Sequence, residues 1–453
     1  MEPHSRTEVE AGTLIPGFWR PGEDRVRQIT FPALHFGSGR ILEAPAIASG
    51  QAYNEHFKQR GELLGEVGSY HFPSLVGRSL VCQYPENSDL CHAAEEMMSG
   101  LCSRMKMLTG KPFDYRLLPY EQLEDAVAEL RQEKSPGTVI FVLNDEACAY
   151  AEVANGLPDW KVKRVTQDTL RTQYRNLTLG ARATNGGVPD KVRGTRHWES
   201  FLRMTTLDVL QVMDGIPFRL DRAARFEAQL VIDVRYDRRY YSLSLLVARG
   251  GDKRPDFKIV SDAWQKADPK HEAVNGRILG DEIIKFMSRC IVPGTDTPLG
   301  SLLIIRDGRL VGDEADAITR AIAELKKRCS LTPDASIEVA ELHKATEMHL
   351  RLWNVSENGA VTNILEGTAV RLSSTTEVLS TTGEGTLKQG TAEPLLIVAP
   401  EGCSCISDIT DALSASAHLN WSSPSVAQRL PLPLKRTDEV LKARSEQEIR
   451  RIH

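Results

Sequence analysis

The stretch SLLIIRDGRLVGDEADAITRAIAELKKR (residues 301–328) decides the fold class. Its first half is an apolar run that ends in Arg-Asp-Gly, which predicts a buried strand closed by a turn. In its second half, Ile318, Ile322 and Leu325 recur at the spacing of one helical face, and basic residues end the segment. Both features favour a helix. ASIEVAELHK (335–344) then predicts another strand. A strand, a helix and a second strand in this order indicate an α/β protein.

Other apolar runs repeat the alternation of strands and helices. Nearer the N-terminus, EQLEDAVAELRQE (121–133) predicts an amphipathic helix, TVIFVLND a buried strand and WKVKRVT a basic strand, followed by a further helix. This order predicts a Rossmann-like unit from about 110 to 185. Residues 1–110 are poorly periodic and predict loops and short strands. QLVIDV, YYSLSLLVA and DEIIKFMSRC predict two strands and a helix before the quoted stretch.

Composition limits the class of protein. The chain has 453 residues, of which 41% are hydrophobic and 26% charged, so we expect about two to three domains with sizeable cores. This composition excludes disordered, collagen-like and coiled-coil proteins. No run of about 18 apolar residues predicts a membrane span, and the N-terminus lacks the apolar segment of a secretion signal. Eight dispersed cysteines without the spacing of a zinc site suit the reducing cytoplasm.

Three aspartates occupy positions where a carboxylate is unfavourable for the fold alone. Asp233 interrupts the apolar run QLVIDV, Asp307 ends the strand of the quoted stretch, and Asp438 opens the last predicted helix. A buried carboxylate is costly unless it is paired, hydrogen-bonded or bound to a metal. If the three converge without histidine or cysteine, they suit Mg²⁺ or Mn²⁺. Two such ions about 4 Å apart would serve phosphodiester hydrolysis.

Each aspartate also has a purely structural explanation. Asp307 with Gly308 can form a simple turn, and Asp438 can cap a helix. Asp233 can pair with Arg235 or Arg238. Convergence of the three carboxylates in one cleft is the observation that separates these explanations from a shared site.

The order of these motifs resembles the PIWI domain of the Argonaute family. The motifs are IDV and its following strand, RDG with a later acidic pair and helix, IEVAELHK, LEGTAV, HLNWSSPS and LPLPLKRTDEVL. The segment upstream resembles the MID domain, and RNLTLGARATNGGVP (175–189) resembles the bridge into PIWI. The resemblance covers about 110–453, and the remaining length is too short for N and PAZ domains. The chain is therefore similar to a short prokaryotic Argonaute, built of MID and PIWI.

This resemblance implies an α/β fold in which a Rossmann-like MID lobe is followed by an RNase H-like PIWI lobe with a mixed sheet. It divides the chain into an N-terminal region (1–110), a MID-like domain that binds the guide 5′ end (111–185) and a PIWI domain (186–453). The N-terminal region either belongs to the MID lobe or provides a docking surface for a partner.

Active PIWI domains use a tetrad of metal-binding residues. The resemblance places Asp233, Asp307 and Asp438 at its first, third and fourth positions, as metal ligands of a site that is either vestigial or active. The second position is a glutamate on a mobile finger. Glu272, in ADPKHEAVNGR, has a suitable spacing, whereas Gly276 takes this position if GRI is aligned instead.

The resemblance also implies contacts to a guide strand, from Tyr150, Lys161, Lys163, Arg164, Arg171, Arg182, Lys344 and Arg351. The first six would surround the guide 5′-phosphate, with Mg²⁺ or Mn²⁺ coordinated there or used in catalysis. The last two would contact guide phosphates. An exposed edge strand explains WKVKR equally well, and a solvated face also explains the last two. Because the net charge is −5, any phosphate-binding surface must be local.

Two functions follow from the resemblance. In the first, the chain is the guide-directed recognition subunit of a prokaryotic antiviral defence system in the cytoplasm. It would bind a guide RNA or DNA and its complementary target, and signal to an APAZ-containing effector protein without cleaving. In the second, it is a guide-dependent endonuclease with a two-metal site. An ordinary RNase H-like nuclease or transposase-type domain is a third, remote alternative. No membrane partner is expected.

Overall fold

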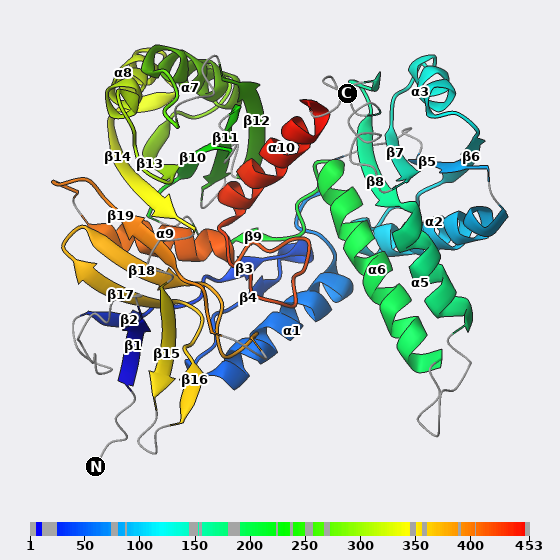
Figure 1. The fold of residues 1–453 in the computed structure, drawn as a ribbon, viewed down its shortest axis with the longest axis horizontal. Coiled ribbons are helices and arrows are strands. Elements are labelled where there is room, and N and C mark those ends of the chain that lie inside the picture. The colour runs from blue at the N-terminus through cyan, green and yellow to red at the C-terminus, as the bar shows by residue number, and fades with distance from the viewer. Residues whose placement is uncertain are drawn as a thin grey trace.

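The computed structural model consists of two α/β lobes, with α10 (Leu432–Glu448) running between them in Figure 1. It describes residues 6–10, 25–73, 80–86, 88–144, 153, 156–179, 191–222, 225–235, 239–249, 257–266, 272–344, 350–355, 360–387, 391–403 and 405–448. Within these ranges, none of the helices combines the length and apolar character that crossing a membrane requires.

The smaller lobe is built on a parallel sheet with the strand order β6-β5-β7-β8. The strands are β5 (Leu80–Pro85), β6 (Tyr115–Tyr120), β7 (Thr138–Leu143) and β8 (Lys161–Thr166). Every residue of β7 is buried, as expected for the apolar run TVIFVL at the inside of a parallel sheet. β8 lies at the edge, and most of its residues are half-buried.

Helices cover both faces of this parallel sheet. On one face, α3 (Leu123–Arg131) packs its buried Ala126, Val127 and Leu130 against the strands. The other face carries α2 (Ser88–Thr109), α5 (Gln167–Leu179) and α6 (Lys191–Val212). The predicted Rossmann-like arrangement is confirmed. The arrangement also includes the strand β5 and the helix α2, which precede residue 111.

The prediction of loops and short strands for residues 1–110 is wrong in part, because two long helices lie there. The 18-residue α1 (Gly50–Val67) begins after Ser49, whose side chain accepts a hydrogen bond from the Ala52 amide at 3.2 Å. Its buried face includes His56 and Arg60 among apolar residues. These two polar side chains interrupt the apolar period that would have predicted the helix.

The larger lobe contains a mixed sheet of nine strands in the order β12-β11-β10-β13-β14-β19-β18-β17-β2. Parallel pairing occurs between β10 and β13 and between β13 and β14, and the other neighbours are antiparallel. The strands are β2 (Val26–Gln28), β10 (Ala228–Val234), β11 (Tyr240–Ala248), β12 (Phe257–Gln265), β13 (Leu299–Asp307), β14 (Leu331–His343), β17 (Thr368–Ser373), β18 (Thr376–Ser380) and β19 (Leu395–Val398). The predicted mixed sheet is confirmed.

Alternating side chains of the central strands supply two separate cores. Leu230 and Ile304 point to the face covered by α7 (Gly276–Cys290) and α8 (Glu314–Lys327). Side chains one position further along point to the opposite face, where they meet α9 (Ile406–Ala417) and the start of α10. The period of two therefore determines which face of the sheet each strand residue reaches.

One continuous core joins the two lobes. It includes Trp198 of α6 and Cys82 of β5 from the smaller lobe, together with Leu246 of β11 from the larger one. Trp421 belongs to the same core, and its indole N–H donates to the carbonyl of Phe218 at 2.8 Å. The lobes are therefore packed together and do not meet only through a linker.

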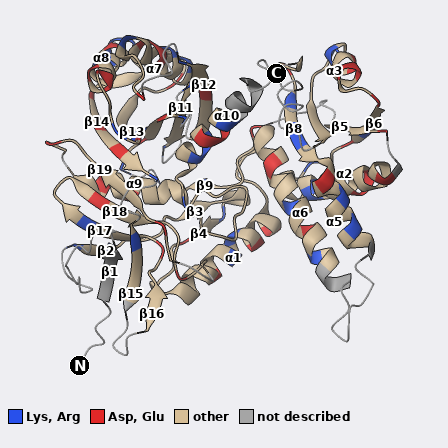
Figure 2. Ribbon diagram, viewed as in Figure 1, with Lys and Arg blue, Asp and Glu red and all other residues tan. Residues whose placement is uncertain are grey.

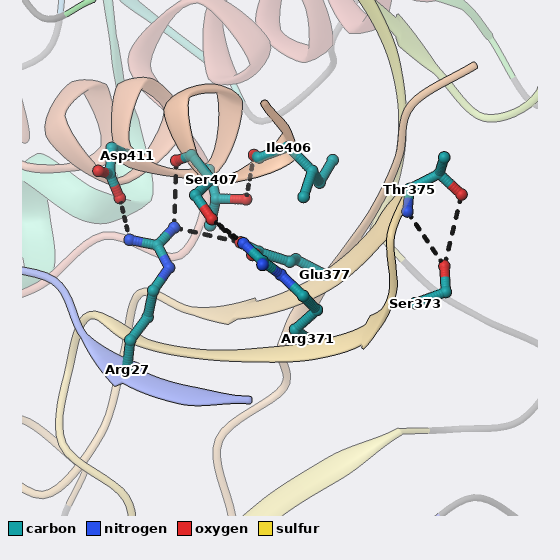
Figure 3. Close-up of polar contacts among 9 residues, drawn as sticks. Arg27, Arg371, Ser373, Thr375, Glu377, Ile406, Ser407 and Asp411 are labelled. Atoms are coloured by element: carbon teal, nitrogen blue, oxygen red, sulfur yellow. Dashed lines mark hydrogen bonds and ion pairs between the residues drawn. The ribbon is translucent and has the colours of Figure 1, made fainter. Parts of the chain in front are cut away.

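N-terminal residues complete the larger lobe. β2 is an edge strand of the nine-stranded sheet, and its Arg27 donates to Asp411 at 2.5 Å and to Glu377 at 3.1 Å (Figure 3). Glu377 is buried and also accepts a bond from the Nε of Arg371 at 3.0 Å. Two small sheets flank this region, formed by β1 (Arg6–Glu10), β15 (Arg351–Val355) and β16 (Val361–Asn363), and by β3 (Leu34–His35), β4 (Ile41–Leu42) and β9 (Arg219–Leu220).

Candidate carboxylate site and interlobe groove

Strand register brings Asp233 and Asp307 together. β10 and β13 are parallel neighbours, and Ile232 lies opposite Arg306, so the next residue of each strand is an aspartate. Because side chains alternate, both aspartates point to the face covered by α9 and α10, while Arg306 points to the other face. Two carboxylates therefore lie side by side at the carboxyl ends of parallel strands, where α/β proteins commonly place ligand-binding groups.

Asp438 reaches the same place from α10. We predicted that it opens this helix, but the helix begins at Leu432, and Asp438 lies in its second turn. Pro433 is tolerated there because the first turn of a helix needs no amide donor. Leu434 packs into the core of the larger lobe, and Asp438 follows it by one turn on the same side.

The three carboxylates form one compact group. One oxygen from each of Asp233, Asp307 and Asp438 lies within 4.8 Å of the others, and among the described residues this is the sole set of three acidic, histidine or cysteine side chains so placed. The predicted alternative partners of Asp233 are Arg235 and Arg238. Arg235 donates to the carbonyl of Leu441 at 3.0 Å, and residue 238 lies outside the described residues.

Lys344 is the counter-ion of this group. Its ammonium lies 2.5 Å from Asp438 Oδ1 and 3.4 Å from Asp233 Oδ2, and it also pairs with Asp307. Although burial opposes the charge, the carboxylates of Asp307, Asp233 and Asp438 raise the pKa of Lys344. We had predicted a contact from Lys344 to guide phosphates, whereas here it faces the carboxylates.

Burial dominates the electrostatics of Asp233. Its side chain is 6% exposed, and burial, followed by the nearby charge of Asp307, raises its pKa well above the usual range. Lys344 lowers this pKa only in part. The three aspartates therefore attract a cation. Without a cation, their carboxylates lie too close together for all three to be fully ionised.

A buried ion pair supports the opposite face of the same strand end. Arg306 and Glu314 are 1% and 0% exposed, and Nε of Arg306 lies 3.1 Å from Glu314 Oε2. Glu314 also accepts the amides of Val274 at 2.9 Å and Val311 at 3.1 Å. This carboxylate therefore holds two loops against the end of β13. Neither member of the pair was predicted from the sequence.

Glu272 lies beside the site but outside the carboxylate group. Its Oε1 is 3.4 Å from where a Cβ on Gly308 would be, next to Asp307, and its side chain is exposed. Its carbonyl accepts a bond from Lys266 at 3.0 Å. The aligned alternative, Gly276, begins α7 and donates its amide to Asp313 at 3.0 Å.

A groove of about 690 Å³ lies between the lobes. It is lined from β8, α6, β12 and α10, with Lys163, Arg164, Arg436 and Lys442 as its basic residues and Asp208 and Glu439 as its acidic ones. Figure 2 shows basic residues on β8 and mixed charges on α10. α10 carries both Asp438 of the carboxylate group and Glu439 of the groove, so the two features adjoin.

The predicted guide contacts other than Lys344 divide into three sets. Lys163 and Arg164 line the groove, although Lys163 also pairs with Asp208 at 2.5 Å. Three others pair elsewhere: Lys161 with Asp214 at 2.9 Å, Arg171 with Asp168 at 3.8 Å, and Arg351 with Glu393 at 2.8 Å. Tyr150 and Arg182 lie outside the described residues.

Sequence reasoning missed several groove residues, above all Gln211, Arg436 and Lys442. Arg436 donates to Gln211 of α6 and, at 2.8 Å, to Glu439. Its place after LPLPLK in the last helix was the one available signal.

Sequence comparison gives no relative, since no protein-family model and no curated protein matches the chain. Solved structures do match. The C-terminal lobe of a budding yeast Argonaute has a TM-score of 0.67 at 13% identity, covering 98% of this chain and 91% of that one. Clostridium butyricum Argonaute, bound to a guide DNA and a 19-mer target DNA, gives 0.63 at 14% identity and 93% coverage of this chain.

Kluyveromyces polysporus Argonaute with a guide RNA gives a TM-score of 0.65 at 12% identity, covering 95% of this chain. The chain spans about half the length of these last two Argonautes, 53% of each. At such low identity the likeness concerns the fold. Together, the two lobes described above have the fold of the C-terminal part of Argonaute proteins, which comprises MID and PIWI.

Proposed function

We propose that the chain is the guide-directed recognition subunit of a prokaryotic defence system. It binds a guide strand and its complementary target, acts in the cytoplasm, and signals to an APAZ-containing effector protein without cutting the target. One observation carries the proposal: the interlobe groove adjoins a carboxylate group whose centre is taken by the Lys344 ammonium.

The groove has the chemistry that a guide strand needs. A strand held through its phosphates leaves its base edges free, so base pairing with the target supplies the sequence specificity. Phosphate contacts require basic groups only along the path of the guide strand. Arg164, Arg436 and Lys442 line the groove and can supply such groups. Local basicity of this kind is compatible with a net charge of −5.

Two features favour binding without cleavage. Glu272, the candidate fourth ligand, is exposed and outside the carboxylate group. The three aspartates offer the hard oxygen ligands that Mg²⁺ or Mn²⁺ prefers, but their oxygens already contact Lys344. The residues therefore fit a divalent ion only if this lysine is displaced.

An active guide-dependent endonuclease is the second candidate, because Asp233, Asp307 and Asp438 do converge. In that case these residues would hold the ions that activate water and stabilise the leaving oxygen. A divalent ion at the guide 5′-phosphate is a separate possibility that both functions allow. We also propose the division at residues 110 and 185, with the upstream β5 and α2 as part of the smaller lobe.

The decisive experiment measures binding and cleavage together. The purified chain is mixed with a labelled 5′-phosphorylated guide and a complementary target in Mn²⁺, as DNA and as RNA. We expect guide and target binding without cuts. Guide-dependent cuts that Asp233→Ala abolishes would overturn the non-cleaving function in favour of the endonuclease.

Groove variants test where the guide lies. Arg164→Glu with Lys442→Glu should weaken guide binding strongly and reduce the slope of log K against log salt, by about 0.7 for each lost phosphate contact. Lys285→Glu reverses a charge on the exposed outer face of α7 and serves as the matched control. Equal guide affinity of the groove variant and this control would place the guide elsewhere.

A further inference from the structure

We propose that Lys344 is a tethered counter-ion that takes the place of a divalent cation among Asp233, Asp307 and Asp438. The chain in this state has low affinity for metal ions, and a cation can bind only after the ammonium has left. The inference rests on the proposed function for the relevance of the site, but it is tested without nucleic acid.

The fold directs Lys344 into the group. β14 is parallel to β13, and Leu342 lies opposite Asp307. Lys344 follows Leu342 by two residues, so its side chain lies on the face of the sheet that carries the carboxylates. Its own carbonyl accepts a bond from the Arg429 guanidinium, which anchors the backbone at the end of the strand.

The number of donors on the ammonium matches the number of aspartates, and its charge is opposite to theirs. It has three N–H donors, and each of the three aspartates supplies one nearby oxygen. A divalent cation would need these same oxygens as its ligands. Metal and ammonium therefore compete for one position, and repulsion between the two charges prevents joint occupancy.

The side chain is able to leave. It is 26% exposed, and its flexible four-carbon stem places the charge at its end, away from the anchored backbone. Departure of the ammonium leaves three carboxylates with up to three negative charges in a half-buried site. Such a site is unstable without a cation, so metal affinity should rise as soon as the lysine charge is removed.

Mn²⁺ titration of the full chain, by calorimetry and by thermal denaturation, tests this inference. Lys344→Met keeps most of the stem and removes the charge, and we expect it to bind Mn²⁺ about tenfold or more tightly than the wild type. Its Tm should rise with Mn²⁺ concentration, while that of the wild type should hardly change. Lys285→Met, which removes an exposed lysine on α7, should behave as the wild type.

Two further measurements identify the site. Adding Asp233→Asn to Lys344→Met should abolish the gain in Mn²⁺ affinity. If Lys344→Met is unfolded without metal, its refolding on addition of Mn²⁺ supports the inference, and failure to refold at millimolar Mn²⁺ contradicts it. A wild-type chain that binds Mn²⁺ as tightly as Lys344→Met, through Asp438, would overturn the inference. Loss of guide binding alone would overturn only the proposed function.

Discussion

Glu314→Ala is the sharpest test of how the strand ends of the carboxylate site are held in place. Glu314 is fully buried and accepts three hydrogen bonds, from Arg306 Nε at 3.1 Å and from the amides of Val274 at 2.9 Å and Val311 at 3.1 Å. Alanine leaves the Arg306 guanidinium buried without its carboxylate and leaves both amides without an acceptor.

The expected loss of stability follows from these three contacts. Removal of one partner from a buried ion pair costs about 3–5 kcal/mol, because the remaining charge stays desolvated. Each orphaned amide adds about 1 kcal/mol or more. We therefore expect the free energy of unfolding to fall by about 5 kcal/mol, a large part of the 5–15 kcal/mol that folded domains possess.

Glu324→Ala is the matched control, since it lies on the same helix and pairs with Arg328 at 2.8 Å, but in an exposed position. Its loss should change the free energy of unfolding only slightly, because solvent screens the pair. Urea denaturation of both variants measures the difference, and hydrogen exchange of 272–276 shows whether the loop is released. Arg306→Met combined with Glu314→Met should recover part of the loss. Equal urea midpoints for Glu314→Ala and its control would refute this reasoning.

Three further predictions concern stability. Burial lowers the pKa of His56 to about 3 and, together with Arg60, that of His418 well below its usual range, so both take up protons more readily when unfolded. The free energy of unfolding should fall below about pH 6.5, by about 1.4 kcal/mol per pH unit for each histidine, and urea titrations of His56→Gln should show a shallower fall. Burial, then Asp307, raises the pKa of Asp233, so the folded state holds that proton more tightly and stability falls as pH rises above about 4. Asp233→Asn should flatten this fall and raise Tm at neutral pH; an unchanged Tm profile would contradict it. Gly37→Ala should lower Tm strongly, because its Cβ would lie 2.4 Å from the carbonyl oxygen of Val67, whereas Gly65→Ala, in open space on α1, should gain about 0.5–1 kcal/mol.

Strand alternation was sufficient to predict where two of the three aspartates lie. Asp307 ends an apolar strand and Asp233 is the next-to-last residue of another, and parallel neighbours place such positions at one edge of a sheet. The beginning of α10 was less predictable, because LPLPLK contains two prolines and was treated as a connection. The helix nevertheless starts at Leu432, since Pro433 falls where a missing amide costs nothing.

Charge pairing between distant segments could not be predicted from the sequence. Lys161 and Lys163 were expected to face phosphates. They pair instead with Asp214, just after α6, and with Asp208, near its end, about 50 residues later in the chain. Lys344 likewise pairs with aspartates from three other elements. A basic strand has the same local pattern whether it binds a ligand or a helix, so only the tertiary structure separates the two.

The core that runs from Trp198 through Leu246 to Trp421 has a consequence for how this protein adapts to what it binds. Separating the two lobes would expose these large apolar side chains to water, and that penalty favours a fixed spacing between the groove walls. We therefore expect a single melting event in calorimetry and no large change of radius in solution scattering when a ligand enters. The groove should adapt to a ligand through rotation of its arginine and lysine side chains, while its walls stay in place.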